Sequence, residues 1–158
     1  MEIFATKSFI IRNFTQDDLV SLNENHIFGD VIQDDLKTII ENSFNDDFDS
    51  EGEKHFAVTY NDKIIGQIQT DIKKLVITIS KTLIDEFDNR IANQEILITL
   101  VKYLHMIYPH REIITYTERF DLKNRGILEM LGFERKNLDK DKGIYTYSLF
   151  KSNPLKDK

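Results

Sequence analysis

Two carboxylates near the end of an extended segment are the first side chains that could take part in chemistry. Glu118 closes the stretch EIITYTE at residues 112–118, and Asp121 follows three residues later. A carboxylate in such a position can accept a proton from a reacting group. A Glu at a strand end is usually only solvated, and an Asp before a helix is usually its N-cap. For each residue, a role in proton transfer and a purely structural role both stay open.

The stretch FDNRIANQEILITLVKYL, residues 87–104, is a short polar turn that runs into an amphipathic helix. Its turn contains Asn89 and Asn93 but no Gly, Ser, Thr or Pro. Asn enters turn conformations readily and caps helices through its side-chain oxygen. One interpretation is therefore structural: Asn89 makes the turn, Asn93 caps the helix, and nothing binds. In the other, Arg90 provides a counter-charge for an anion, although three carboxylates lie close by at positions 85–88.

Cysteine and histidine usage excludes several kinds of site. The chain has no cysteine, so disulfides, zinc–thiolate sites and cysteine nucleophiles are excluded. The four histidines show no metal-ligand spacing, and we predict no metal. His105 lies off the apolar stripe of its helix, which predicts an exposed surface side chain.

Length and charge limit the class of protein. With 158 residues and 41% hydrophobic residues, we expect one domain over 1–158, with its core at about 8–151 and a fraying tail at 152–158. A net charge of -6 argues against general nucleic-acid binding, although a small anion could bind locally. No segment reaches the roughly 18 apolar residues of a membrane span, and none resembles a signal peptide. We therefore expect a cytoplasmic protein without nucleic-acid or membrane partners.

Hydrophobic periodicity predicts an alternation of strands and helices. We expect strands at 8–14, 55–60, 63–70, 75–83, 112–118 and 144–151, helices at 14–22, 32–44, 96–108 and 122–131, and a solvated loop at 45–54. The last strand either ends the fold alone or forms a final hairpin. Thr15 and Asp18 have capping-box spacing. Asn61 and Asp62 tolerate the positive φ of a tight hairpin turn, and Gly132 is a natural C-cap. The order predicts a mixed α/β (α+β) fold, with a mostly antiparallel sheet crossed by one central helix.

Three stretches resemble the GNAT superfamily of acyl-CoA-dependent N-acetyltransferases. The most similar branch includes the ribosomal-protein N-terminal alanine acetyltransferases. The stretches are FIIRNFTQDDLVSL, HFAVTYNDKIIGQIQT and DLKNRGILEMLGFERK, the last with Glu129, Leu131, Gly132 and Phe133 in register. The resemblance spans residues 8–151 and implies the GNAT fold.

The resemblance also implies a reaction and a binding site. An amine would attack the thioester of acetyl-CoA directly in a ternary complex, with acyl-CoA and an amine acceptor as partners and no metal. The strand edge VITIS, with Ile77, Thr78 and Ile79, would hold the pantetheine and polarise the thioester carbonyl. Asn124 would hydrogen-bond a ligand. The pyrophosphate would lie at the helix N-terminus, on Asn89, Arg90, Ile91, Ala92, Asn93 and Gln94.

The sequence departs from the family pattern at this turn and at the proton-transfer positions. Asn89 and Ile91 replace two glycines, so we expect strain at Ile91 if it adopts a positive φ, and a side chain that obstructs the phosphate site. The usual base position holds Thr78, and the usual Tyr position holds Leu128. The leading hypothesis is an enzyme that acetylates a peptide N-terminus or small amine. The alternative is a catalytically silent binding or assembly module. The fold also suggests a possible homodimer through its final strands.

Overall fold

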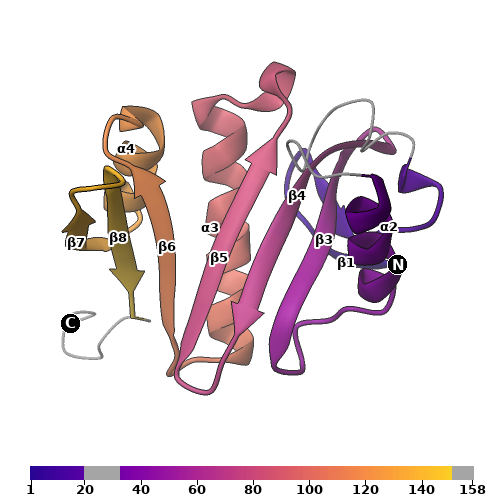
Figure 1. The fold of residues 1–158 in the computed structure, drawn as a ribbon, viewed down its shortest axis with the longest axis horizontal. Helices are drawn as coiled ribbons and strands as arrows, with labels where there is room; N and C mark the ends of the chain where they lie inside the picture. Colours follow the sequence, from indigo (N-terminus) through magenta and orange to yellow (C-terminus); the bar gives the residue numbers. More distant parts are fainter. Residues whose placement is uncertain (20–32, 151–158) are drawn as a thin grey trace.

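The computed structural model describes residues 1–19 and 33–150 (Figure 1). Within these ranges, eight strands form one sheet in the order β1-β2-β3-β4-β5-β6-β8-β7. The elements are β1 (Glu2–Ala5), β2 (Ile10–Arg12), α2 (Gln33–Ser43), β3 (Gly52–Tyr60), β4 (Lys63–Ile72), β5 (Val76–Leu83), the short 3-10 turn η1 (Asp85–Phe87), α3 (Arg90–Ile107), β6 (Glu112–Glu118), α4 (Leu122–Met130), β7 (Glu134–Asp139) and β8 (Ile144–Leu149). Only β5 and β6 pair in parallel; the other neighbours are antiparallel. The predicted fold class is confirmed.

The predicted hairpin and meander in the middle of the chain are also confirmed. Asn61 and Asp62 connect β3 to β4 with φ values of 48° and 65°. Positive φ at both central residues is the type I′ geometry that matches the right-handed twist of strands. β4 then pairs with β5 from Gly66↔Leu83 to Ile72↔Ile77 without a register shift.

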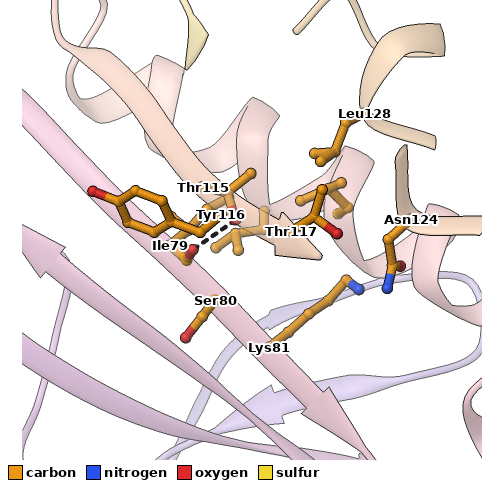
Figure 2. Close-up of a pocket in the computed structure, with 10 residues that line it drawn as sticks. Ile79, Ser80, Lys81, Thr115, Tyr116, Thr117, Asn124 and Leu128 are labelled. Atoms are coloured by element: carbon orange, nitrogen blue, oxygen red, sulfur yellow. Dashed lines mark hydrogen bonds between the residues drawn. The ribbon is translucent and has the colours of Figure 1, made fainter. Parts of the chain in front are cut away.

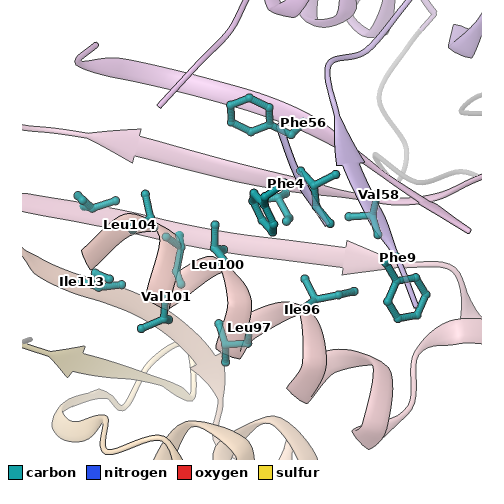
Figure 3. Close-up of a cluster of buried hydrophobic side chains, with 14 of the residues drawn as sticks. Phe4, Phe9, Phe56, Val58, Ile96, Leu97, Leu100, Val101, Leu104 and Ile113 are labelled. Atoms are coloured by element: carbon teal, nitrogen blue, oxygen red, sulfur yellow. The ribbon is translucent and has the colours of Figure 1, made fainter. Parts of the chain in front are cut away.

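Helices cover both faces of the sheet (Figure 1). On β3, Phe56 and Val58 belong to the main core, whereas Ala57 between them belongs to a smaller cluster with Ile40 of α2. This is the alternation that a strand buried on both faces requires. Figure 3 shows the main core between the sheet and the apolar side of α3, which carries Ile96, Leu97, Leu100, Val101 and Leu104.

The capping box is confirmed at the start of the first predicted helix. The Thr15 amide donates to Asp18 Oδ2 at 2.7 Å, and Arg12 forms an ion pair with the same carboxylate at 2.8 Å. The remainder of that helix, from residue 20 on, lies outside the described residues.

Three expectations need correction. β1 was not predicted, because four residues carry too little periodicity. β3 begins at Gly52, so the end of the predicted loop 45–54 is strand. The final segment, expected as a strand or a hairpin, is the hairpin β7–β8. His105 is only 7% exposed, so its predicted exposure is wrong. It follows Val101 by four residues and therefore shares the buried side of α3.

Candidate active site

The two edges of β5 differ along its C-terminal half. On one edge β4 stays paired as far as Leu83. On the other edge, backbone pairing with β6 covers Val76 to Thr78 only. Beyond that point the Thr115 side chain, not a backbone amide, donates to the Ile79 carbonyl at 2.9 Å. β5 and β6 therefore diverge, as their upper halves in Figure 1 show.

A pocket of about 100 Å³ lies where these strands separate. Strand residues, α3 and α4 contribute to its wall: Ile79, Ser80, Lys81, Leu97, Leu100, Thr115, Tyr116, Thr117, Asn124 and Leu128. Figure 2 shows β5 and β6 side chains on one side and Asn124 and Leu128 of α4 on the other. The pocket wall thus combines apolar side chains, mainly from α3 and α4, with polar side chains from β5, β6 and α4.

Backbone groups of β5 face this pocket at alternate residues. The Leu75 carbonyl accepts from Glu112 of β6 at 3.1 Å, and the Ile79 carbonyl accepts from Thr115. Because the hydrogen-bonding groups of a strand alternate between its edges, Ile79 and Lys81 present their amides toward β6, whereas Ser80 presents its amide toward β4. The last parallel pair, Thr78↔Ile114, engages the Ile79 amide, so Lys81 is the first residue whose β6-facing amide lies beyond the described register.

The N-terminus of α3 lies beside the same strand. The Phe87 ring, just before α3, packs on Tyr60 with ring centroids 5.1 Å apart. Asn89 is the N-cap, with φ −123° and ψ 169°, and its side chain accepts from the Ala92 amide at 2.9 Å. Since the Asn93 amide bonds to the Asn89 carbonyl, the first-turn amides of Arg90 and Ile91 remain without an intrahelical acceptor. Together with the helix dipole they form a positive end.

The expected strain at this turn is wrong. Among the described non-glycine residues, only Asn61 and Asp62 have positive φ, so neither Asn89 nor Ile91 is left-handed. Ile91 belongs to α3, and its side chain is 80% exposed. Its bulk points into solvent because the helix begins at Arg90, before the position of the second family glycine. The turn avoids the need for glycine by starting the helix earlier.

Asn93 has a different role from the predicted helix cap. It is 2% exposed and donates to Asp88 Oδ1 at 2.8 Å and to the Asn89 carbonyl at 2.7 Å. Its side-chain oxygen accepts from Lys81 Nζ. Asp88 also pairs with Lys123 of α4 at 2.8 Å. Asn93 therefore joins β5, the turn and, through Asp88, α4.

This network shifts two pKa values. Burial lowers the pKa of Lys81 to about 8. Burial acts to raise the pKa of Asp88, but hydrogen bonds from Lys123 and Asn93 outweigh it and hold that pKa below its usual value. Sequence reasoning missed Lys81. The signal was its register, because it follows the inward-facing Ile77 and Ile79 at intervals of two residues.

The structure brings only some of the predicted site residues together. Ile79 and Asn124 line the pocket, and Asn89 to Gln94 form the cap and first turn of α3. Ile77 is buried in the core, and Thr78 lies where β5 and β6 are still paired.

The two candidate carboxylates differ in their contacts. Asp121 is the N-cap of α4, and its two oxygens accept from the Asn124 amide at 3.1 Å and from the Asn124 side chain at 2.6 Å. Glu118 is exposed at the end of β6. Because Thr115 and Thr117 face the α3 side, Glu118 and Tyr116 face the opposite side of the sheet.

The described residues contain neither a metal-binding cluster nor a membrane-spanning helix. Residues 1–19 and 33–150 contain no group of three or more His, Asp or Glu side chains placed to hold a metal ion. No helix in those same ranges has the length and apolar character needed to cross a membrane.

Comparison with known proteins identifies the family. The model of the acetyltransferase (GNAT) domain matches residues 11–148. The chain therefore belongs to the GNAT acetyltransferase family, and the predicted enzyme class is confirmed. Enzymes of this family use acetyl-CoA and transfer its acetyl group to amines. No curated protein sequence matches the chain.

Solved structures share the fold at low sequence identity. A GNAT-family acetyltransferase from Bacillus anthracis has a TM-score of 0.78 at 16% identity, over 97% of this chain and 100% of that one. A chimera of spermidine N-acetyltransferase SpeG from Vibrio cholerae and hSSAT has a TM-score of 0.75 at 13% identity, over 92% and 96%. RimL, a ribosomal L7/L12 alpha-N-protein acetyltransferase in complex with coenzyme A, has a TM-score of 0.76 at 9% identity, over 95% and 98%.

Proposed function

We propose that this chain transfers an acetyl group from acetyl-CoA to a primary amine, either a peptide N-terminus or a small amine. The amine attacks the thioester directly in a ternary complex. One observation carries the proposal: β5 has an unpaired edge beyond Thr78, this edge borders a pocket, and the N-terminus of α3 lies beside it. A cytoplasmic location and a possible homodimer, through the exposed edge strand β7, belong to the same proposal.

The residues of the pocket fit such a coenzyme. When bound, acetyl-CoA supplies the acyl thioester. The Lys81 amide, beyond the paired stretch, is available as a donor to an amide-rich chain or to a thioester carbonyl, in the way that an oxyanion hole acts. At about 100 Å³ the pocket is smaller than the roughly 300–1,000 Å³ of complete ligand sites, so it suits the reactive end.

The first turn of α3 suits the anionic end of the coenzyme. The amides of Arg90 and Ile91 are free of intrahelical partners, and a helix N-terminus favours negative charge. Ile91 leaves these amides uncovered because its side chain is 80% exposed. The Arg90 side chain, also exposed, provides a counter-charge. The missing glycines are therefore compatible with coenzyme binding.

The amine approaches from the face of the sheet opposite α3. Tyr116 and Glu118 lie on that side of β6, at the gap between the strands. We propose Glu118 as the residue that takes the proton of the amine, directly or through water. Asp121 is a weaker candidate because both of its oxygens already accept hydrogen bonds from Asn124. Leu128 cannot donate a proton to the departing thiolate.

The relatives suggest two acceptors to test. The SpeG chimera is a spermidine N-acetyltransferase, and RimL acetylates the N-terminus of ribosomal L7/L12. At 13% and 9% identity these similarities support the fold alone. A polyamine and a short peptide with a free N-terminus should therefore be compared side by side.

Thermal melting and thiol release test the proposal together. Acetyl-CoA at about 100 times its Kd should raise the free energy of unfolding by about 2.7 kcal/mol. Because the chain has no cysteine, any thiol that appears after an amine is added comes from the coenzyme. Stabilisation followed by amine-dependent thiol release supports the proposal. Stabilisation without thiol release from any acceptor favours the silent binding module, and no stabilisation at saturating coenzyme contradicts the proposal for this donor.

A further inference from the structure

The pocket contains an amine of the protein itself. Lys81 lies on β5 in the inward register, two residues beyond Ile79, and its side chain lines the pocket. Figure 2 shows the side chain running from β5 toward Asn124 of α4. Its Nζ donates to the buried Asn93 side chain at the first turn of α3. The amine is therefore held between the strand edge and the two helices that border the pocket.

The surroundings of Lys81 favour its neutral form more than solvent does. Burial is the main cause and lowers its pKa from 10.5 to about 8. Among charged neighbours, Asp88 and Asp121 act to raise that pKa and Lys123 acts to lower it. Asn93 accepts one N–H, so the lone pair of a neutral Lys81 is not used by this hydrogen bond. A neutral amine with an available lone pair is a nucleophile.

We propose that Lys81 is a self-acylation site, at which its Nζ takes the acyl group from a thioester bound in the pocket. This inference rests on the proposed function, because the thioester is that of acetyl-CoA. The neutral nitrogen forms a C–N bond to the acyl carbon, and the C–S bond breaks. The coenzyme leaves as a thiolate and takes up the proton that the nitrogen releases. No oxidant, reductant or further reactant is needed.

Position distinguishes Lys81 from its neighbour Lys123. The Lys123 side chain is 32% exposed and forms an ion pair with Asp88, so it lies at the rim with its charge compensated. Lys81 is fixed beside the strand edge that holds the thioester, and this proximity replaces a bimolecular encounter with an intramolecular one. Acetylation would remove the Lys81 charge and place an amide in a pocket of about 100 Å³. The modified chain should therefore acetylate other amines more slowly.

Mass spectrometry of the full chain tests this inference. The protein is incubated with acetyl-CoA and no acceptor, and intact mass and peptide mapping are followed over time. One acetyl group should accumulate on Lys81, at a first-order rate independent of protein concentration. The rate should rise about tenfold per pH unit below pH 8 and level off above it. Lys81→Arg should abolish this phase, and Lys123→Arg should retain it.

Calorimetric titration of the same samples with acetyl-CoA separates the two proposals. Binding without acetylation of Lys81 overturns the self-acylation site and leaves the proposed function intact. Absence of binding overturns both. Acetyl groups spread over exposed lysines, or equal labelling of the urea-unfolded chain, also overturn the inference. Because the wild-type map identifies the modified residue directly, the test does not depend on the folding of any variant.

Discussion

The two edges of β5 show how one strand can serve both as scaffold and as binding surface. Toward β4, pairing is continuous and so close that Gly66 has no room for a side chain. Toward β6, pairing stops at Thr78 and a threonine hydroxyl takes the place of a backbone donor. The closed edge positions the strand, while the open edge leaves the Lys81 amide available. The candidate site is therefore defined mainly by the stretch where β5 and β6 are not paired, and less by particular side chains.

The largest expected effect comes from forcing the closed edge apart with Gly66→Val. A Cβ at Gly66 would lie 2.3 Å from the Thr82 carbonyl oxygen and 3.2 Å from Leu83 Cα, so backbone must move. We expect a loss of about 3 kcal/mol in urea unfolding. Gly126→Ala is the matched control, because nothing lies within 4 Å of its added Cβ and Ala is the better helix former. If Gly66→Val is as stable as the wild type, the claim that β4 and β5 pack too closely for a side chain at Gly66 is wrong.

Lys81→Met tests whether the buried charge of Lys81, beside the open edge, destabilises the folded protein. The pH dependence of the free energy of unfolding is the readout. The folded-state pKa, about 8, is below the unfolded value of 10.5, so the cost of the charge is full below pH 8 and disappears above pH 10.5. Wild-type stability should rise across this window. The variant should therefore gain stability on the order of 2 kcal/mol at pH 7, allowing for partial solvent access, and little at pH 10.5. Lys102→Met, at an exposed position on α3, is the control. A pH-independent difference would contradict the assignment.

Thr115→Val removes the one hydroxyl that replaces backbone pairing at the point where the strands separate. The Ile79 carbonyl would remain buried without its donor, so we expect a loss of about 1.5 kcal/mol in urea unfolding. Thr117→Val is the matched control on the same face of β6, because Thr117 also lines the pocket but its hydroxyl makes no hydrogen bond with the described residues. Should both variants lose the same free energy, the Thr115 bond has no special role at the open edge.

Lys123→Ala should have the smallest effect. Its ion pair with Asp88 joins α4 to the turn before α3, but both side chains are partly exposed, at 32% and 41%. Partly exposed pairs contribute little, so we expect about 0.5 kcal/mol, decreasing with added salt. Thermal melting at two salt concentrations measures it. A loss above about 2 kcal/mol would show that this pair, and not the strand edge, holds the site together.

Much of the scaffold could be predicted from local sequence because local signals and tertiary packing agree. The Asn61–Asp62 turn, the Thr15–Asp18 capping box and the end of α3 before Pro109 each follow from the chemistry of a few adjacent residues. β1 could not be predicted, since a short strand is stabilised by pairing with β2 and not by its own four residues.

The site was less predictable because it depends on where a helix begins and where two strands separate. The glycine positions of the family suggested strain at Ile91, yet α3 starts at Arg90 and turns that side chain outward. Lys81 was overlooked because a lysine near a strand end is normally solvated. Only the register of β5, with the packing of α3 and α4, shows that its amine is enclosed.

Hydrogen exchange of individual amides, measured with and without coenzyme A, tests the central claim most directly. The claim is that the coenzyme binds along the open edge of β5. Exchange at the Lys81 amide should slow at least about tenfold when coenzyme saturates the protein, whereas Ser80 and Thr82, whose amides face β4, should change little. Slower exchange at the Arg90 and Ile91 amides would show that the anionic end of the coenzyme lies at the N-terminus of α3. Unchanged exchange at the Lys81 amide, in a sample that coenzyme A stabilises against heat, would contradict the account.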